Sequence, residues 1–254
     1  MKIGWCAPLQ KAELVKRTGY DFLEVPLAGF GLEDDQSLVA AKAAVAKSPL
    51  PALVFNWFFP QDMYIVGPNV DAARVKGYLA RAADLMHAAG AQAAVLGSAW
   101  SRNVPDNWER SRAEEQILEA YSWCADAVAG TGVTIGIEAQ NRKEANIIIS
   151  VEEAVEYAKQ VNRPEIAVMA DFYHMDEEKE PLENIRKYCE WLVHIQMADT
   201  GRRSPGTGAY DYDTFFGYLK ECGYKGNISV ECMIEIPEDE MRYSAQFLRR
   251  HWPT

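Results

Sequence analysis

Short apolar runs alternate with longer amphipathic stretches along the whole sequence. The runs are rich in Val, Ile and Ala and span Lys2–Trp5, Asp21–Val25, Ala52–Phe55, Gln92–Gly97, Val133–Glu138, Ile166–Asp171, Leu192–Met197 and Asn227–Cys232. Continuous apolar runs of this length predict parallel strands that are buried on both faces.

Between the runs, apolar residues recur at spacings of three and four, which predicts helices. The clearest helical patterns cover residues 70–89, 109–129 and 151–161, the last with Ser150 three residues before Glu153 as in a capping box. A further helix is expected to begin near the aspartates of residues 211–213. The last helix is expected after Pro237, ahead of three acidic residues.

Strand and helix alternate eight times, which predicts an α/β fold in the form of a closed (β/α)8 TIM barrel. An open, doubly wound sheet is the alternative. It usually has fewer strands and a glycine-rich first turn, and no GxGxxG follows the first run. Because no repeat or linker interrupts the pattern, we expect residues 1–254 to form a single domain.

Composition narrows the class of protein. The formal net charge of -11 disfavours a nucleic-acid partner, since an acidic surface repels phosphates. No apolar stretch is long enough for a signal peptide or a membrane span, so we expect a cytoplasmic protein. The five cysteines are odd in number and form no C-x-x-C pair, so we expect reduced thiols and neither a disulfide framework nor a structural zinc site.

Oxygen-bearing side chains lie at the ends of the last four runs, where barrel enzymes place their active sites. They are Glu138, Asp171, Gln196 and Glu231. A single acid at a strand end is more often a helix cap or a solvated charge. Four on adjacent strands are harder to explain in that way, because acids inside apolar runs are costly to bury without a cation. Such hard ligands suit Mg²⁺ or Mn²⁺ better than zinc or copper.

Other polar residues follow on the same loops. His174 lies three residues after Asp171, Glu144 lies six residues after Glu138, and His194 lies two residues before Gln196. A turn at residues 205–208 could hold Arg202 and Arg203 over the barrel mouth. Ser98 and Arg102, after the fourth run, are weaker candidates for binding phosphate.

Four segments of the sequence carry a family resemblance. GIEAQNRKE, MADFYHM, HIQMADTGRRSPGTGAYDY and GYKGNISVE follow one another in this order, after the opening KIGW and GYDFLEVPL. Together they resemble the sugar phosphate isomerase/epimerase family, whose members are xylose isomerase-like TIM barrels and include ketose 3-epimerases and hydroxypyruvate isomerase-type enzymes.

The resemblance implies an isomerase with one divalent metal ion, Mn²⁺ or Mg²⁺ or else Co²⁺. It implies a ligand set of Glu138, Asp171, Gln196 and Glu231. It also implies that Glu138 and Glu231 are the paired acid and base. The residues that would contact the substrate are His174, Arg202 and Glu144, with the spacing from Gln196 favouring Arg202 over Arg203.

The third ligand position departs from part of the family. Many ketose 3-epimerases have histidine there, in an H-x-H string, whereas this chain has His194-Ile195-Gln196. Glutamine at this position resembles the hydroxypyruvate isomerase-type members instead. Because an amide oxygen can still coordinate a hard cation, the departure preserves the metal site and leaves the identity of the sugar open.

The implied reaction moves a proton next to the carbonyl of a small ketose or keto-sugar, through an enediolate. Return of the proton to the opposite face gives an epimer, and return to the neighbouring carbon gives an aldose–ketose isomer. The alternatives are a lyase that eliminates the C1 substituent of a 3-keto-glycoside, an endonuclease-type phosphodiesterase with a histidine-rich multi-metal cluster, and a non-catalytic sugar-binding barrel. The expected partner is a small sugar, with no nucleic acid and no membrane. A homo-oligomer is an option because related barrels often pair.

Overall fold

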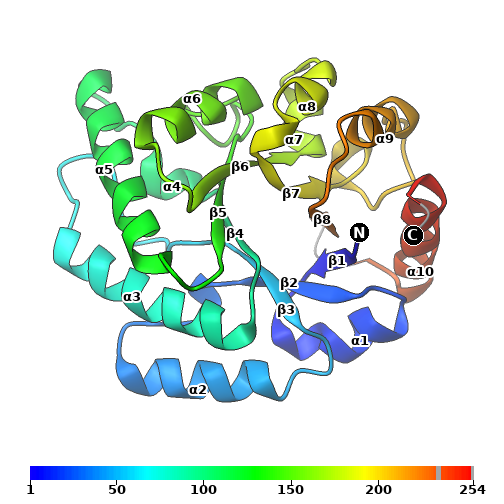
Figure 1. Ribbon diagram of the computed structural model, residues 1–254, viewed down its shortest axis with the longest axis horizontal. Helices are drawn as coiled ribbons and strands as arrows, with labels where there is room; N and C mark the ends of the chain where they lie inside the picture. Colours follow the sequence, from blue (N-terminus) through cyan, green and yellow to red (C-terminus); the bar gives the residue numbers. More distant parts are fainter. Residues whose placement is uncertain (233–235, 253–254) are drawn as a thin grey trace.

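The computed structural model describes residues 1–232 and 236–252, in which eight parallel strands form a closed barrel (Figure 1). Each strand pairs with the next, and β1 pairs with β8 to close the ring. The strands are β1 Ile3–Cys6, β2 Phe22–Pro26, β3 Ala52–Asn56, β4 Ala93–Leu96, β5 Thr134–Glu138, β6 Ile166–Asp171, β7 Leu192–Met197 and β8 Asn227–Val230. The predicted fold class is confirmed, and both ends of every strand lie within two residues of the ends of the predicted run.

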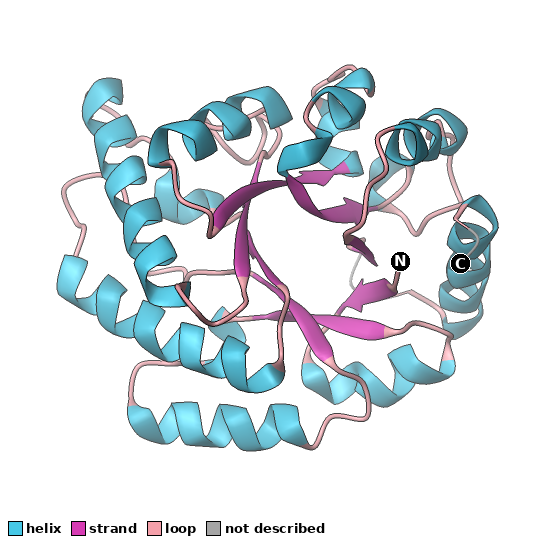
Figure 2. Cartoon of the chain, in the orientation of Figure 1, coloured by secondary structure: helices cyan, strands magenta, loops and turns pink. Residues whose placement is uncertain are grey.

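Helices surround the strand ring (Figure 2). The α-helices are α1 Ala12–Arg17, α2 Asp35–Ala46, α3 Ala72–Ala89, α4 Ala99–Arg102, α5 Arg110–Val128, α6 Val151–Val161, α7 Phe172–Glu177, α8 Glu183–Lys187, α9 Tyr212–Glu221 and α10 Glu238–His251. Short 3-10 turns are η1 Leu9–Lys11, η2 Ala28–Phe30, η3 Cys189–Trp191 and η4 Thr200–Arg202. The helices predicted from spacing correspond to α3, α5 and α6, and those predicted from the residues at their beginnings correspond to α9 and α10.

Helix ends follow the local sequence signals. The Ser150 side chain accepts a hydrogen bond from the Glu153 backbone N–H at 3.1 Å, which caps α6 as the sequence predicted. The Glu153 carboxylate accepts from the backbone N–H of Ile149, one residue before the cap, so the capping box is closed one residue early. Helix α10 begins directly after Pro237 with three acids in its first turn, where they face the positive end of the helix dipole.

The apolar core has two parts. The larger part fills the layer between strands and helices, with residues such as Phe55, Leu79 and Ile137. A smaller cluster contains Phe22 of β2. The Phe22 ring lies so close to Gly4 of β1 that a Cβ there would come within 2.3 Å of it, so a side chain at position 4 would clash with the ring.

One expectation about the cysteines was wrong. Cys189 and Cys222 form a disulfide that joins η3 to the residue after α9, whereas Cys6 and Cys124 are free thiols. The two residues are 33 positions apart in the sequence and become neighbours only when α8 and α9 pack side by side. Within residues 1–232 and 236–252, no helix combines the length and the apolar character that a membrane crossing requires.

Candidate active site

The carboxyl ends of β5 to β8 bring the four predicted ligands to one rim of the barrel. Glu138 and Asp171 are the last residues of β5 and β6, Gln196 is the second-last residue of β7, and Glu231 directly follows β8. Asp171 is aligned with Gln196 in the β6–β7 pairing. Because neighbouring parallel strands end on the same side, these four side chains share the rim where barrel active sites lie.

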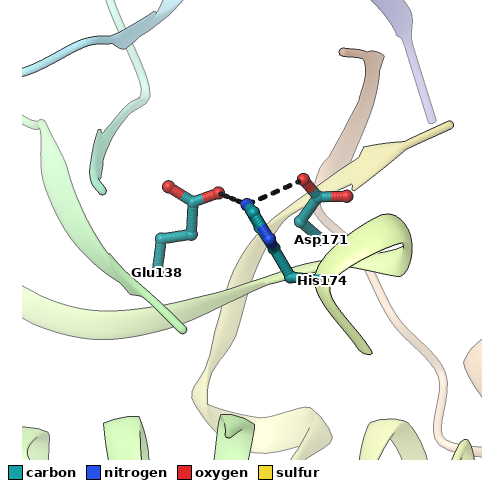
Figure 3. Close-up of side chains that lie close together, drawn as sticks. All are labelled: Glu138, Asp171 and His174. Carbon is teal, nitrogen blue, oxygen red and sulfur yellow. Dashed lines mark ion pairs between the residues drawn. The ribbon is translucent and has the colours of Figure 1, made fainter. Parts of the chain in front are cut away.

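Glu138, Asp171 and His174 form the tightest cluster. One potential ligand atom from each lies within 4.8 Å of the other two, and all three residues are buried. Figure 3 shows both carboxylates facing the imidazole, with His174 Nε2 3.5 Å from Glu138 Oε1 and 3.6 Å from Asp171 Oδ2. His174 reaches this point because it lies in the first turn of α7, directly after β6.

Glu231 lies next to this cluster and is paired with Arg202. The guanidinium contacts Glu231 Oε2 at 2.8 Å and Glu144 Oε1 at 3.3 Å, and it packs over the Tyr173 ring at 4.8 Å. Asn56 of β3 donates to Glu231 Oε1 at 3.4 Å. The structure therefore connects Arg202 and Glu144, the two residues predicted from the loops, to the acid after β8.

Arg202 and Arg203 have different positions. Arg203 turns away and donates from its Nε to the Thr200 carbonyl of its own loop at 3.1 Å. Arg202 has a left-handed backbone conformation with φ of 59°, which is uncommon for a residue with a side chain. This conformation lets two consecutive arginines point to different places, and it directs only Arg202 at the acids.

Gln196 is fully buried, and its amide is held from one side. Its Nε2 donates to Glu24 Oε1 of β2 at 2.5 Å. Glu24 is also fully buried, and its other oxygen accepts from Ser229 and contacts His194 Nε2 at 2.8 Å. His194, which the sequence placed near the rim, is therefore engaged inside the barrel.

The proton on His174 can be assigned from its neighbours. The Asn141 side chain donates to His174 Nδ1 at 2.8 Å, and its own Oδ1 accepts from the Lys143 backbone N–H at 3.0 Å. Since that second bond fixes the amide oxygen, Asn141 presents its NH2 to the ring. Nδ1 is therefore the acceptor, and the hydrogen of the neutral imidazole lies on Nε2, toward the two carboxylates.

Burial and mutual repulsion shift the acids toward their neutral forms. Burial, reinforced by the charges of Glu231 and Asp171, raises the pKa of Glu138 well above its ordinary value. Burial raises the pKa of Asp171 to about 6 and that of Glu231 to about 7, although Arg202 opposes both shifts. Burial lowers the pKa of His174 to about 4, so this imidazole is neutral near pH 7.

The donor atoms fit a hard divalent cation. Asp171 Oδ2 and Gln196 Oε1 are buried and have no hydrogen-bond partner among the described residues, although buried polar atoms are normally paired. Carboxylate and amide oxygens are the ligands that Mg²⁺ and Mn²⁺ prefer. The raised pKa values reflect burial and, after it, neighbouring negative charge, and a cation bound between the acids would neutralise that charge.

Arg102 and Ser98 do not form a phosphate site, so that weaker expectation was wrong. Arg102 is 1% exposed, and its guanidinium donates to the Leu96 carbonyl at 2.9 Å and to the Glu138 carbonyl at 2.7 Å. Ser98 is also buried and accepts from the Phe59 backbone N–H at 3.0 Å. Arg102 instead joins the ends of β4 and β5 beneath the rim.

Sequence reasoning missed four residues of this site: Glu24, Asn56, Gly97 and Asn141. A Cβ at Gly97 would lie 1.5 Å from Glu138 Oε2, so the missing side chain makes room for the catalytic candidate. A signal existed for two of the four. Glu24 is an acid inside an apolar run, and Asn141 lies inside one of the family-like segments.

Comparisons with known proteins agree with the barrel fold. The family model described as xylose isomerase-like TIM barrel matches residues 12–251. The ketose 3-epimerase of Arthrobacter globiformis is 27% identical over 222 residues, 85% of this chain and 74% of that protein. The 3-dehydro-D-guloside 4-epimerase of Escherichia coli is 25% identical over 252 residues, 95% of this chain and 94% of that protein. The crystal structure of 3-keto-D-glucoside 4-epimerase from E. coli shares the fold, with a TM-score of 0.83, 22% identity, and coverage of 98% of this chain and 99% of that one.

Proposed function

The chain belongs to the family of xylose isomerase-like TIM barrels, and on this basis we propose that it is a divalent-metal-dependent isomerase that epimerises a small ketose or keto-sugar. The relatives named above are epimerases of ketoses and of keto-glycosides, and epimerases belong to the isomerase class. The observation that carries the proposal is the pair of glutamates at the rim, the buried Glu138 and the partly buried Glu231, of which Glu231 helps to raise the pKa of Glu138.

Such a pair suits proton transfer at a carbon next to a carbonyl. A positioned carboxylate can both accept a proton from such a carbon and return one to it. Glu138 and Glu231 lie at the ends of strands three positions apart in the ring. A sugar bound between them would present one face to each carboxyl group. One glutamate removes the proton, and the other supplies a proton to the opposite face.

The residues of the rim would also bind the cation and the substrate and stabilise the charge that develops in the reaction. Glu138, Asp171, Gln196 and Glu231 would hold the cation, which supplies Lewis-acid polarisation of the substrate carbonyl when bound. His174 Nε2–H and the Arg202 guanidinium, which lie beside the two glutamates, would stabilise the negative charge that develops on the enediolate oxygen. Glu144, joined to Arg202, would accept a hydrogen bond from a hydroxyl at the far end of the sugar.

The phosphodiesterase alternative has less support. That chemistry needs a histidine-rich multi-metal cluster. Among residues 1–232 and 236–252, the one cluster of His, Cys, Asp and Glu side chains that could hold a metal ion contains a single histidine, His174. His194 is engaged by Glu24 and Ser229. The lyase alternative uses the same proton abstraction, so it is an outcome of the test below.

Proton exchange with solvent tests the proposal. The purified chain, loaded with Mn²⁺, Mg²⁺ or Co²⁺, is incubated in D2O with a panel of ketoses and 3-keto-glycosides. We expect deuterium to enter at the epimerised carbon, and we expect the exchange to stop when a chelator removes the metal ion. Release of the C1 substituent instead would identify the lyase.

Substitution of each glutamate by glutamine separates the two proton carriers. Glu138→Gln and Glu231→Gln keep an oxygen for the metal but remove a base, so turnover is expected to fall at least about a hundredfold. Each variant should still exchange the proton on the face served by the other glutamate. Full epimerisation by both variants would show that the protons move through other residues.

A further inference from the structure

Glu24 lies outside the ligand set, yet it contacts one of its members directly. Its Oε1 accepts from Gln196 Nε2 at 2.5 Å, across 172 positions of sequence. Its Oε2 accepts from Ser229 and contacts His194 Nε2 at 2.8 Å. The two oxygens of Glu24 thus have different partners, and Oε1 accepts its hydrogen bond from Gln196.

The chemistry of the two groups determines how the Gln196 amide is turned. A carboxylate only accepts hydrogen bonds, whereas an amide has one donating end and one accepting end. Glu24 therefore requires the NH2 end of Gln196 to face it. The Oε1 end then faces away from Glu24, and this atom has no hydrogen-bond partner among the described residues.

The orientation matters because a glutamine ligand has two ends of nearly the same shape. The oxygen attracts a cation, and the NH2 group repels it. Either end could face the cation site unless a neighbour distinguishes them. Asp171 is aligned with Gln196 in the adjacent strand. For both residues to bind one cation, the oxygen of the Gln196 amide must face the same site as the Asp171 carboxylate.

We infer that Glu24 is a positioning residue that holds the Gln196 amide with its oxygen toward the cation. This inference rests on the proposed function, because it requires Gln196 to be a metal ligand. Partners that orient a metal ligand from behind typically contribute about ten- to a hundredfold to metal affinity.

Two conservative variants separate orientation from charge. Glu24→Asp keeps the charge but withdraws the carboxylate from Gln196 by one carbon–carbon bond. Glu24→Gln removes the charge but keeps the reach, since its oxygen can accept from Gln196 while its NH2 donates to the Ser229 hydroxyl. If Glu24 acts by orienting the amide, Glu24→Asp is the more damaging change. If it acts only as a nearby negative charge, Glu24→Gln is.

The measurement is the Kd for Mn²⁺ of the metal-free full chain, by calorimetry or by the EPR signal of free Mn²⁺. We expect Glu24→Asp to weaken binding about tenfold or more and Glu24→Gln by less than about threefold. In the Gln196→Ala background, Glu24→Asp should have almost no further effect, because the group it orients is gone. At saturating Mn²⁺, kcat of Glu24→Asp should return to within about threefold of the native value, which a general structural defect would not allow.

Ser229→Ala is the matched control. It removes a hydrogen bond from the same buried carboxylate but leaves Oε1 with Gln196. We expect it to lower the melting temperature while leaving the Mn²⁺ Kd within about threefold. Glu24→Ala is measured in parallel, so that either folded variant decides the question.

The outcomes distinguish this inference from the proposed function. If the native chain binds no Mn²⁺, or if Gln196→Ala leaves the Kd unchanged, the metal site as proposed is wrong and the role of Glu24 is wrong with it. If Gln196→Ala weakens Mn²⁺ binding but Glu24→Asp and Glu24→Ala do not, only the inference about Glu24 is overturned. A larger loss in Glu24→Gln than in Glu24→Asp overturns it as well.

Discussion

The guanidinium of Arg202 contacts the carboxylate of Glu231 at 2.8 Å, from a loop that follows β7 to the residue that follows β8. Arg202 is held there by three partners, Glu231, Glu144 and the Tyr173 ring. It is the cation nearest to one of the two glutamates proposed to carry protons. Its charge opposes the rise in the pKa of Glu231 that burial causes.

Substitution of Arg202 should affect catalysis far more than substitution of its neighbour. Arg202→Met removes a donor from the place where the enediolate charge develops, so kcat/KM should fall about a hundredfold. Arg203→Met is the matched control and should stay within about threefold, because Arg203 donates to its own loop. Steady-state kinetics of the two variants tests this. Equal losses would mean that the loop as a whole, rather than Arg202, is needed.

Asn141→Asp should reverse the proton position on His174. A carboxylate beside Nδ1 accepts rather than donates, so the neutral ring would carry its hydrogen on Nδ1 and lose the Nε2–H donor. The bond from the Lys143 backbone to the side-chain oxygen is retained. Near pH 8 we expect kcat to fall about a hundredfold with the fold intact, which kinetics and circular dichroism would measure.

Nitrogen NMR of His174 provides an independent readout of the same change. The native protein should give the pattern of an Nε2–H imidazole, and Asn141→Asp that of an Nδ1–H imidazole. Unchanged nitrogen shifts in the variant would contradict the proton assignment made from Asn141.

Gly97→Ala should disable the site while leaving the barrel folded. Its Cβ would lie 1.5 Å from Glu138 Oε2, so the carboxylate must move from its present position. We expect both Mn²⁺ affinity and kcat to fall about tenfold or more. Gly77→Ala is the control. It lies within α3 with only the end of the Arg81 side chain nearby, and it should raise stability by roughly 1 kcal/mol. Native activity in Gly97→Ala would refute the tight fit.

Metal binding should become more stabilising as the pH rises. The pKa of Asp171 is raised to about 6 and that of Glu231 to about 7, so the folded metal-free chain binds these protons more tightly than the unfolded chain. Its stability is therefore expected to fall as the pH rises from about 4 to about 7, with little further effect from these groups above that.

Because Mn²⁺ replaces those protons, the increase in melting temperature caused by Mn²⁺ should be larger at pH 8 than at pH 5. Thermal unfolding with and without Mn²⁺ at the two pH values measures this. Glu231→Gln should lose part of this pH dependence, since it removes the acid with the higher pKa of the two. An equal shift at both pH values would argue that these carboxyl groups do not take up the metal.

The sequence was sufficient to predict the barrel and to predict that the site lies at the carboxyl ends of its strands. A buried parallel strand must be almost wholly apolar, so eight apolar runs marked the strands and a polar residue at the end of a run was conspicuous. Glu138 and Asp171 were found in this way, and both are the last residues of their strands. Capping residues such as Ser150 were also readable, because the hydrogen bond they form spans only three residues.

Contacts across the barrel were decided by the tertiary structure alone. Glu24 resembled an irregularity in an apolar run, and only ring closure brings β2 and β7 close enough for it to reach Gln196. The Cys189–Cys222 bond and the proton on His174 depend in the same way on how loops and helices pack. The spacing from Gln196 favoured Arg202 over Arg203, and the left-handed backbone of Arg202 decided it. Local periodicity carries information about burial along one segment. It carries none about which distant side chain completes a hydrogen bond, because that depends on where the backbone places both partners in space.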